Sequence, residues 1–153
     1  IFHGALPGEK IVTNKISTRA FDRESHPGIS PIQVEEDKLS SIRGESWIAF
    51  KDFDFEQGAN KVIMEAATPG PGGTVELRID SENGPLIASL EIENTGSWTN
   101  YIRHDARVDD AITGVHDLYL KFVDTFNNEV MFETRNFWLI RERNDRTQYH
   151  REF

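Results

Sequence analysis

Short runs in which apolar and polar residues alternate are the feature that most constrains this chain. A period of two places one face of an extended segment against a core and the other face in water, as in a half-buried β-strand. The clearest runs lie at residues 47–51, 61–65, 74–79 and 117–122. No amphipathic helix stands out, and we expect about eight or nine short strands. The pattern therefore predicts an all-β fold.

Turn sequences rich in glycine and proline, such as TPGPGG and SENGP, separate these runs. Strands so closely spaced favour a two-sheet antiparallel β-sandwich, and closure of the jelly-roll type limits exposed edges. At 153 residues the chain fits one domain with one core. We assign residues 1–15 to a linker or an added edge strand, 16–141 to the sandwich, and 142–153 to a polar C-terminal tail.

The charge balance narrows the classes of partner. Lys and Arg number 17 against 26 Asp and Glu, which gives a net charge of −9. This charge opposes attraction to phosphate backbones or anionic lipid, so we expect neither nucleic acid nor a membrane as a partner. No run approaches the ~20 apolar residues of a membrane span, and the first residues do not resemble a secretory signal. The chain has no cysteine, so cysteine usage says nothing about its compartment.

Trp98 lies in a bend rich in Gly, Ser, Thr and Asn between two strand-like runs. Its flat apolar face and single N–H donor suit the C–H face of a sugar ring. The alternative is that Trp98 folds back to cap the sandwich. Trp47 and Trp138 lie inside strand patterns, and we expect them in the core. Trp98 is therefore the aromatic residue that points to recognition.

A specific order of segments carries a resemblance to a known family. Around Gly73 the chain reads GGTVELRIDSENGPLIASLEI, followed by TGSW at 95–98 and TGVHDLYLKF at 113–122, with GESWIAF upstream at 44–50. This order resembles the family 6 carbohydrate-binding modules, most strongly over residues 73–123. The resemblance implies a β-sandwich that binds an oligosaccharide or polysaccharide. It also implies a monomeric module that is extracellular or periplasmic and is carried in one parent chain with a catalytic domain.

The resemblance also implies which residues surround the sugar. Family members usually hold a pyranose ring between two aromatics in a loop cleft, beside an asparagine of the last strand. Trp98 matches the first aromatic, whereas Ser41 stands in the region of the second and Thr134 at the asparagine. Polar neighbours that could complete the cleft are Arg43, Asn100, Asn127, Asn128 and Arg135. Asn127 and Asn128 could equally form a turn.

Arginine in the cleft would leave the class of glycan open. If Arg43 and Arg135 both line it, an acidic glycan becomes an option, because a guanidinium matches a carboxylate with two parallel hydrogen bonds. Each alone is more often a surface ion-pair partner. The concave face of a sheet is a second place where this family binds sugar, and the sequence does not choose between the two.

The family often carries a structural calcium ion, and calcium prefers hard oxygen ligands. By resemblance, Asn136 could supply a neutral oxygen, and Glu24, Glu35 and Glu36 could supply carboxylates. Arg19 stands where the family has a first-strand glutamate. The alternative to a calcium site is a solvated acidic loop.

No motif predicts catalysis. The spacings of a nucleophile elbow, a P-loop and a zinc protease are all absent from the sequence. Glycoside hydrolysis needs two carboxylates across a cleft, and Asp105, Asp109 and Asp110 lie in a polar segment that is better explained as a solvated loop. We therefore expect a noncatalytic module. A structural spacer that has lost sugar binding is the alternative, because the second aromatic is missing.

Overall fold

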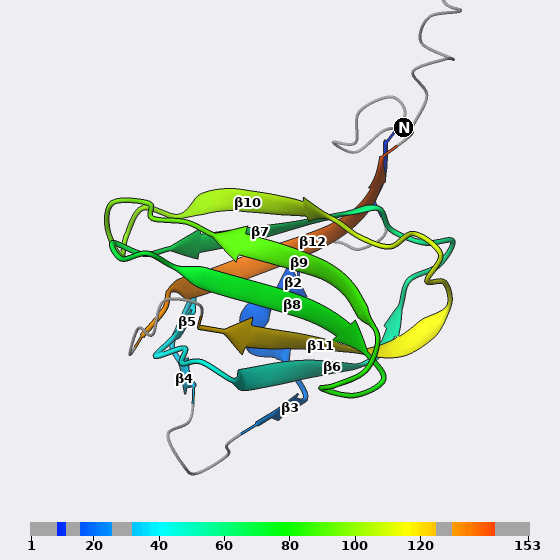
Figure 1. Cartoon of the computed structure of the whole chain (residues 1–153), viewed down its shortest axis with the longest axis horizontal. Coiled ribbons are helices and arrows are strands. Elements are labelled where there is room, and N and C mark those ends of the chain that lie inside the picture. Colours follow the sequence, from blue (N-terminus) through cyan, green and yellow to red (C-terminus); the bar gives the residue numbers. More distant parts are fainter. Residues whose placement is uncertain (1–8, 12–15, 26–31, 125–129, 143–153) are drawn as a thin grey trace, which may run out of the picture.

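Two antiparallel sheets pack face to face in the computed structural model, which describes residues 9–11, 16–25, 32–124 and 130–142. Figure 1 shows the two layers and the turns that join them. The only helical element of the described residues is the 3-10 helix η1 (Thr18–Ala20). No helix in these residues is long and apolar enough to cross a membrane. The predicted all-β, two-sheet antiparallel sandwich is confirmed.

The seven-stranded sheet is built around the long strand β12. Its main order is β10 (Ile102–Arg107), β7 (Lys61–Ala67), β12 (Glu133–Glu142), β5 (Leu39–Ser40) and β4 (Gln33–Val34). Two short strands, β1 (Glu9–Ile11) and β2 (Ile16–Ser17), also pair with β12. β1 lies within the segment predicted to be a linker or an edge strand, and β12 ends at the first residue of the predicted tail.

The five-stranded sheet carries most of the alternating runs that predicted the fold. Its order is β3 (Arg23–Glu24), β6 (Ser46–Asp54), β11 (Val115–Val123), β8 (Gly73–Ile79) and β9 (Leu86–Ile92). The predicted runs at 47–51, 74–79 and 117–122 lie in β6, β8 and β11, and the run at 61–65 lies in β7 of the other sheet.

The core fills the space between the sheets. Phe50 of β6 meets Phe137 of β12 edge to face, with ring centroids 5.3 Å apart. Phe122 and Phe132 form a second such pair at 5.8 Å. Edge-to-face rings place the positive edge of one against the negative face of the other. Because successive strand residues face opposite sides, these inward phenylalanines determine which neighbours face outward.

The expectation that Trp47 and Trp138 lie in the core is wrong. Both are only half-buried. Trp47 precedes the fully buried Ile48, and Trp138 stands between the fully buried Phe137 and Leu139. The alternation of a strand therefore turns both indoles to the outer faces of their sheets.

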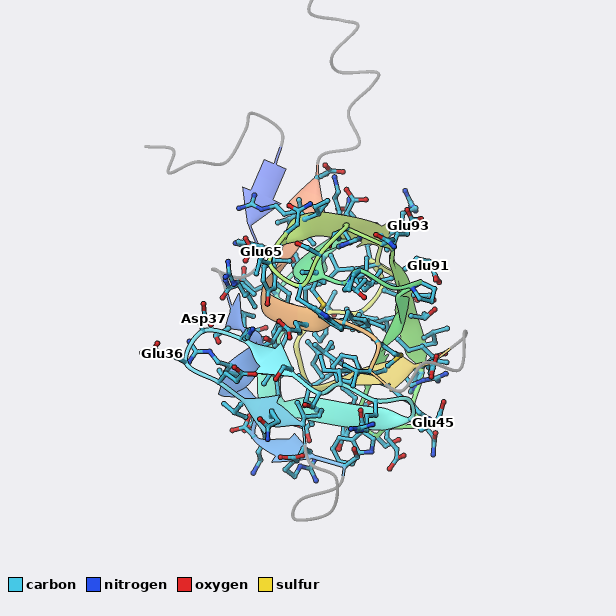
Figure 2. All side chains as sticks on the ribbon, turned by 90° about the vertical axis from the view of Figure 1, so that its left-hand side faces the viewer. Glu36, Asp37, Glu45, Glu65, Glu91 and Glu93 are labelled. Atoms are coloured by element: carbon cyan, nitrogen blue, oxygen red, sulfur yellow. The ribbon has the colours of Figure 1, made fainter. Side chains whose placement is uncertain are left out.

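Strand directions gather several connections at one end of the sandwich. β6 and β8 both run antiparallel to β11, so both begin at the same end, where β9 also ends. In the other sheet β7 ends beside the first residues of β10 and β12. We call this the loop end. It comprises residues 35–38, 41–45, 68–72, 93–101 and 130–132, lies at the left in Figure 1 and faces the viewer in Figure 2.

Candidate functional site

The loop that carries Trp98 is anchored to the end of β7. The Thr95 amide donates to the Thr68 carbonyl at 2.8 Å, and the Thr68 amide donates to Thr95 Oγ1 at 3.0 Å. Thr95 Oγ1 also lies 3.1 Å from the Ser97 carbonyl, to which it can donate. Both threonines are buried. The base of the loop is therefore tied to both sheets before any ligand arrives.

The tip of the same loop is braced by its own polar side chains. The Asn100 side-chain amide donates to the Thr95 carbonyl at 2.6 Å, and the Gly96 amide donates to Asn94 Oδ1 at 2.7 Å. Gly96 has φ of +96°, a left-handed conformation that glycine adopts without steric cost. Asn100, which was predicted to contact sugar, also positions the loop through its side-chain amide.

Trp98 is displayed at the tip of this loop. Its exposed fraction is 39%, the highest of any aromatic side chain in the described part of the chain. A tryptophan that capped the core would be more deeply buried, so this exposed fraction favours a displayed indole over the capping alternative. The loop holds an indole toward solvent on a braced backbone, an arrangement that favours contact with a ligand.

Ser41 and Arg43 stand at the loop end, just before β6. Ser41 has φ of +57° and is half-buried, and Arg43 is exposed. The backbone between them is held by a hydrogen bond from the Met131 amide to the Ile42 carbonyl at 2.9 Å. This segment therefore presents small and polar groups where the resemblance implies a second aromatic ring.

Thr134 does not reach the surface of the loop end. It is fully buried, and its hydroxyl donates to the Glu65 carbonyl at 2.8 Å. Its own carbonyl accepts from Thr18 Oγ1 at 3.2 Å. The prediction that Thr134 contacts sugar is therefore wrong, because strand alternation turns it inward and its neighbours Glu133 and Arg135 outward.

Sequence reasoning missed a polar cluster around Tyr101. The guanidinium of Arg135 lies 3.9 Å from the centroid of the Tyr101 ring, a cation–π geometry. The Tyr101 hydroxyl donates to Glu133 Oε1 at 3.1 Å, and Lys38 Nζ lies 2.9 Å from the same oxygen. Arg135 also pairs with Asp37 at 3.4 Å. These contacts span more than 30 positions in the sequence, so no local pattern signals them.

Electrostatics keep the Tyr101 cluster in one protonation state near neutral pH. Burial raises the pKa of Tyr101, and the negative charge of Glu133 raises it further. The hydrogen bond to Glu133 raises the pKa of Lys38. Lys38 therefore stays charged and Tyr101 stays neutral, and Arg135 is held between an aromatic ring and a carboxylate.

Carboxylates surround the loop end. Figure 2 looks directly at this end and labels six acidic residues around it. Five of them are exposed: Glu36, Asp37, Glu45, Glu91 and Glu93. The lysine and arginine of the Tyr101 cluster are already paired with acids. The negative charge of these residues opposes the binding of an acidic glycan, the class of ligand that Arg43 and Arg135 had left open.

The predicted calcium ligands come from different elements of the sandwich, and calcium binding stays a prediction. Glu24 lies on β3 of the five-stranded sheet, whereas Asn136 lies on β12 and its side-chain amide donates to Glu65 Oε1 at 2.9 Å. Glu35 accepts a hydrogen bond from Ser40 Oγ, and Glu36 is exposed. No group of three Asp, Glu, His or Cys side chains in the described ranges could hold a metal ion.

Asn127 and Asn128, which were predicted to contact sugar, lie outside the described residues.

A second outward aromatic surface lies on the five-stranded sheet. Trp47 packs against Tyr119 with ring centroids 5.2 Å apart. Arg23 Nη2 donates to the Tyr119 hydroxyl at 2.5 Å and lies 3.7 Å from Asp117. Tyr119 is buried, so this pair offers less aromatic surface than Trp98.

The fold and the braced tryptophan define a lectin-like β-sandwich. The family model described as carbohydrate binding module (family 6) matches residues 20–139, and the chain belongs to this family. Family 6 modules bind carbohydrate without catalysing a reaction, so the chain is a noncatalytic carbohydrate-binding module. The prediction from the resemblance is confirmed, and the spacer alternative is not favoured.

Several relatives with matching sequence are glycoside hydrolases. The chain is 31% identical over 93 residues to an arabinoxylan arabinofuranohydrolase of Paenibacillus polymyxa, and 31% identical over 89 residues to an endo-1,4-beta-xylanase A of Thermoclostridium stercorarium. These matches cover 61% and 58% of the chain but only 14% and 17% of the relatives. The chain therefore corresponds to a small part of each enzyme.

Solved structures agree with this assignment. A β-1,3-glucan-binding family 6 module of Bacillus halodurans has a TM-score of 0.75 and 25% identity, with 85% of this chain and 97% of that chain covered. A family 6 module of Clostridium cellulolyticum in complex with xylose also has a TM-score of 0.75, at 24% identity over 84% of this chain and 97% of that chain. In both comparisons the match extends over almost the whole of the solved module.

Proposed function

We propose that this module binds a neutral polysaccharide through Trp98 at the loop end and that it holds a glycoside hydrolase of the same parent chain close to that polymer. The observation that carries the proposal is the exposed indole on a loop braced by Thr95 and Asn100. The matched relatives are named for arabinoxylan and xylan hydrolysis, which supports a plant cell-wall polymer as the ligand. Such polymers are degraded outside the cytoplasm, so we propose an extracellular or periplasmic location, and a monomeric module remains our expectation.

The chemistry of the loop end suits an uncharged sugar. The C–H face of a pyranose ring packs on the indole and removes apolar surface from water. Ser41 and the backbone of the loop offer hydroxyl and amide groups to the sugar hydroxyls. The acidic rim opposes uronic-acid and sulfated chains, because like charges repel.

A single exposed indole stacks on one face of the sugar. Without a second ring on the opposite face, less apolar surface is buried per sugar and each contact is weak. Weak contacts remain useful when the module and the catalytic domain share one chain, because tethering raises the local concentration of the enzyme at a polymeric substrate. The proposal therefore predicts stronger retention on long polymers than on short oligosaccharides.

Native affinity electrophoresis in gels that contain arabinoxylan, laminarin or hydroxyethylcellulose tests the proposal. The wild type is compared with Trp98→Ala and with Leu86→Ala, a control that removes an exposed apolar side chain from another edge of the sandwich. Leu86 is 49% exposed, slightly more than Trp98. We expect at least one polymer to retard the wild type and Leu86→Ala but not Trp98→Ala.

Two results would contradict the proposal. The first is retardation of Trp98→Ala equal to that of the wild type, which would remove Trp98 from the site. The second is retardation by alginate or a sulfated glycan at about 0.15 M salt together with none by the neutral polymers, because residual charge attraction is screened under these conditions.

A further inference from the structure

A cavity of about 410 Å³ lies at the end of the seven-stranded sheet where β7 begins and where β10 and β12 end. Trp98 lies in the loop before β10 begins, so the cavity is at the opposite end of the sandwich. Its size is within the ~300–1,000 Å³ range of small-molecule sites. No part of the Trp98 site contributes to its lining.

The walls of this cavity are held in place by backbone contacts. The Asn60 side chain makes two hydrogen bonds with the backbone of Glu142, donating from Nδ2 to its carbonyl and accepting from its amide at Oδ1, each at 2.7 Å. The Asn60 carbonyl accepts from the Val108 amide at 3.0 Å. Three segments distant in sequence are therefore joined around the cavity, which is formed without a ligand.

Charged groups of both signs line the cavity. Lys61 Nζ lies 3.1 Å from Glu142 Oε2 and 3.5 Å from Asp105 Oδ2. The Asp105 side chain is 60% exposed, so its carboxylate keeps acceptor capacity toward solvent. Arg107 is exposed and has no ion pair or side-chain hydrogen bond with another described residue. Its guanidinium donors are therefore available to a ligand.

An aromatic surface lies beside the cavity. Asp105 is the cross-strand partner of Ile63, and Ile63 is in turn the partner of Trp138. Partners of this kind have Cβ atoms about 4.5–5.5 Å apart. Ile63 and Trp138 are half-buried and face outward, and the Arg103 guanidinium lies 4.6 Å from the centroid of the Trp138 ring. Arg103 Nε also lies 3.8 Å from Glu65 Oε2.

We propose that the cavity and the adjoining Ile63–Trp138 surface form a second saccharide-binding site, which takes a segment of a neutral glycan chain. Each sugar hydroxyl both donates and accepts a hydrogen bond. Arg107 and Lys61 offer donors to it, and the carboxylates of Asp105 and Glu142 offer acceptors. The C–H groups of the ring pack against Ile63 and the edge of Trp138. The lining carries Lys61 and Arg107 against Asp105, Asp110 and Glu142, and this mixture of both signs favours a neutral ligand over a phosphate or a metal cation.

This site goes beyond the proposed function, because it does not depend on Trp98. Two separated sites on one rigid sandwich allow a single polymer, or two neighbouring chains, to be held at both ends of the module. The second contact then forms at high effective concentration, and retention on a polymer exceeds that of either site alone.

Titration of the ¹⁵N-labelled chain with xylohexaose, laminarihexaose and cellohexaose, followed by amide chemical shifts, tests this inference. In the wild type we expect at least one hexasaccharide to move the amides around Asn60, Lys61 and Arg107. Trp98→Ala keeps these shifts. Arg107→Ala weakens the binding that they report about tenfold or more, as expected for loss of hydrogen bonds from a charged donor. Lys51→Ala, which removes an exposed cation elsewhere, changes nothing.

The outcomes separate the two proposals. If no hexasaccharide moves the cavity amides at millimolar concentration, or if Arg107→Ala binds there as the wild type does, the second site is refuted. Loss of the shifts around Trp98 alone would refute the site of the proposed function and leave the second site standing. Folding of each variant is checked by the dispersion of its amide spectrum.

Discussion

Replacement of Thr95 by valine tests whether the base of the loop, and not only its tryptophan, creates the site at the loop end. Valine keeps the shape of threonine but removes the hydroxyl that accepts from the Thr68 amide at 3.0 Å. Thr68 is 1% exposed, so its amide loses an acceptor in a place that water does not readily reach. A buried donor left unpaired costs about 1–3 kcal/mol. For a chain of this size that loss lowers Tm by roughly 2–12 °C.

Thermal unfolding followed by circular dichroism measures this effect, with Thr99→Val as the matched control. Thr99 is exposed and four positions away in the same loop, so its substitution is expected to change stability by less than about 0.5 kcal/mol. We also expect Thr95→Val to weaken polymer retention, because Trp98 is no longer held in one orientation. If Thr95→Val melts at the same temperature as Thr99→Val, the hydroxyl does not brace the loop and the reasoning fails.

Two further predictions follow from backbone space and from burial. Gly72→Ala should destabilise the fold by more than about 4 kcal/mol, because Gly72 has φ of +83° and the new Cβ would lie 1.8 Å from the Ile92 carbonyl oxygen. Gly96→Ala should cost only about 1–2 kcal/mol, because nothing lies within 4 Å of its Cβ. Chemical denaturation measures both losses of stability, and equal losses would contradict this prediction. Burial lowers the pKa of His104 from 6.5, so the unfolded chain binds the proton more readily and stability falls as the pH drops through that range. Urea unfolding at about pH 5.5 and about pH 7.5 should show a smaller difference for His104→Gln than for the wild type, and an unchanged difference would refute the role of this histidine.

The strand pattern predicted the architecture because the period of two depends only on local chemistry. The runs in β6, β7, β8 and β11 were found this way, and the segment order around Gly73 and Trp98 predicted the family. Alternation alone does not say which of two apolar faces is buried. Along Trp47, Ile48, Ala49 and Phe50 both faces are apolar, and packing against the other sheet turned Trp47 outward.

The last strand shows the same limit at the site. A shift of one residue exchanges the faces of a strand, so an uncertain register for β12 could not distinguish the buried Thr134 from the outward Arg135. The Tyr101 cluster and the cavity near Arg107 depend on residues that strand pairing brings together across long separations. No local signal reports such pairings.

The sequence by itself determined the fold class, the family and the tryptophan at the loop end, because each depends on short-range patterns or on the order of motifs. Only the tertiary structure decided that Trp98 is exposed while Thr134 is buried, that Asn100 braces the loop, and that Glu24 and Asn136 lie on strands of different sheets. The physical reason is that exposure and proximity follow from how two sheets pack and in which register their strands pair. Neither is a property of any single segment.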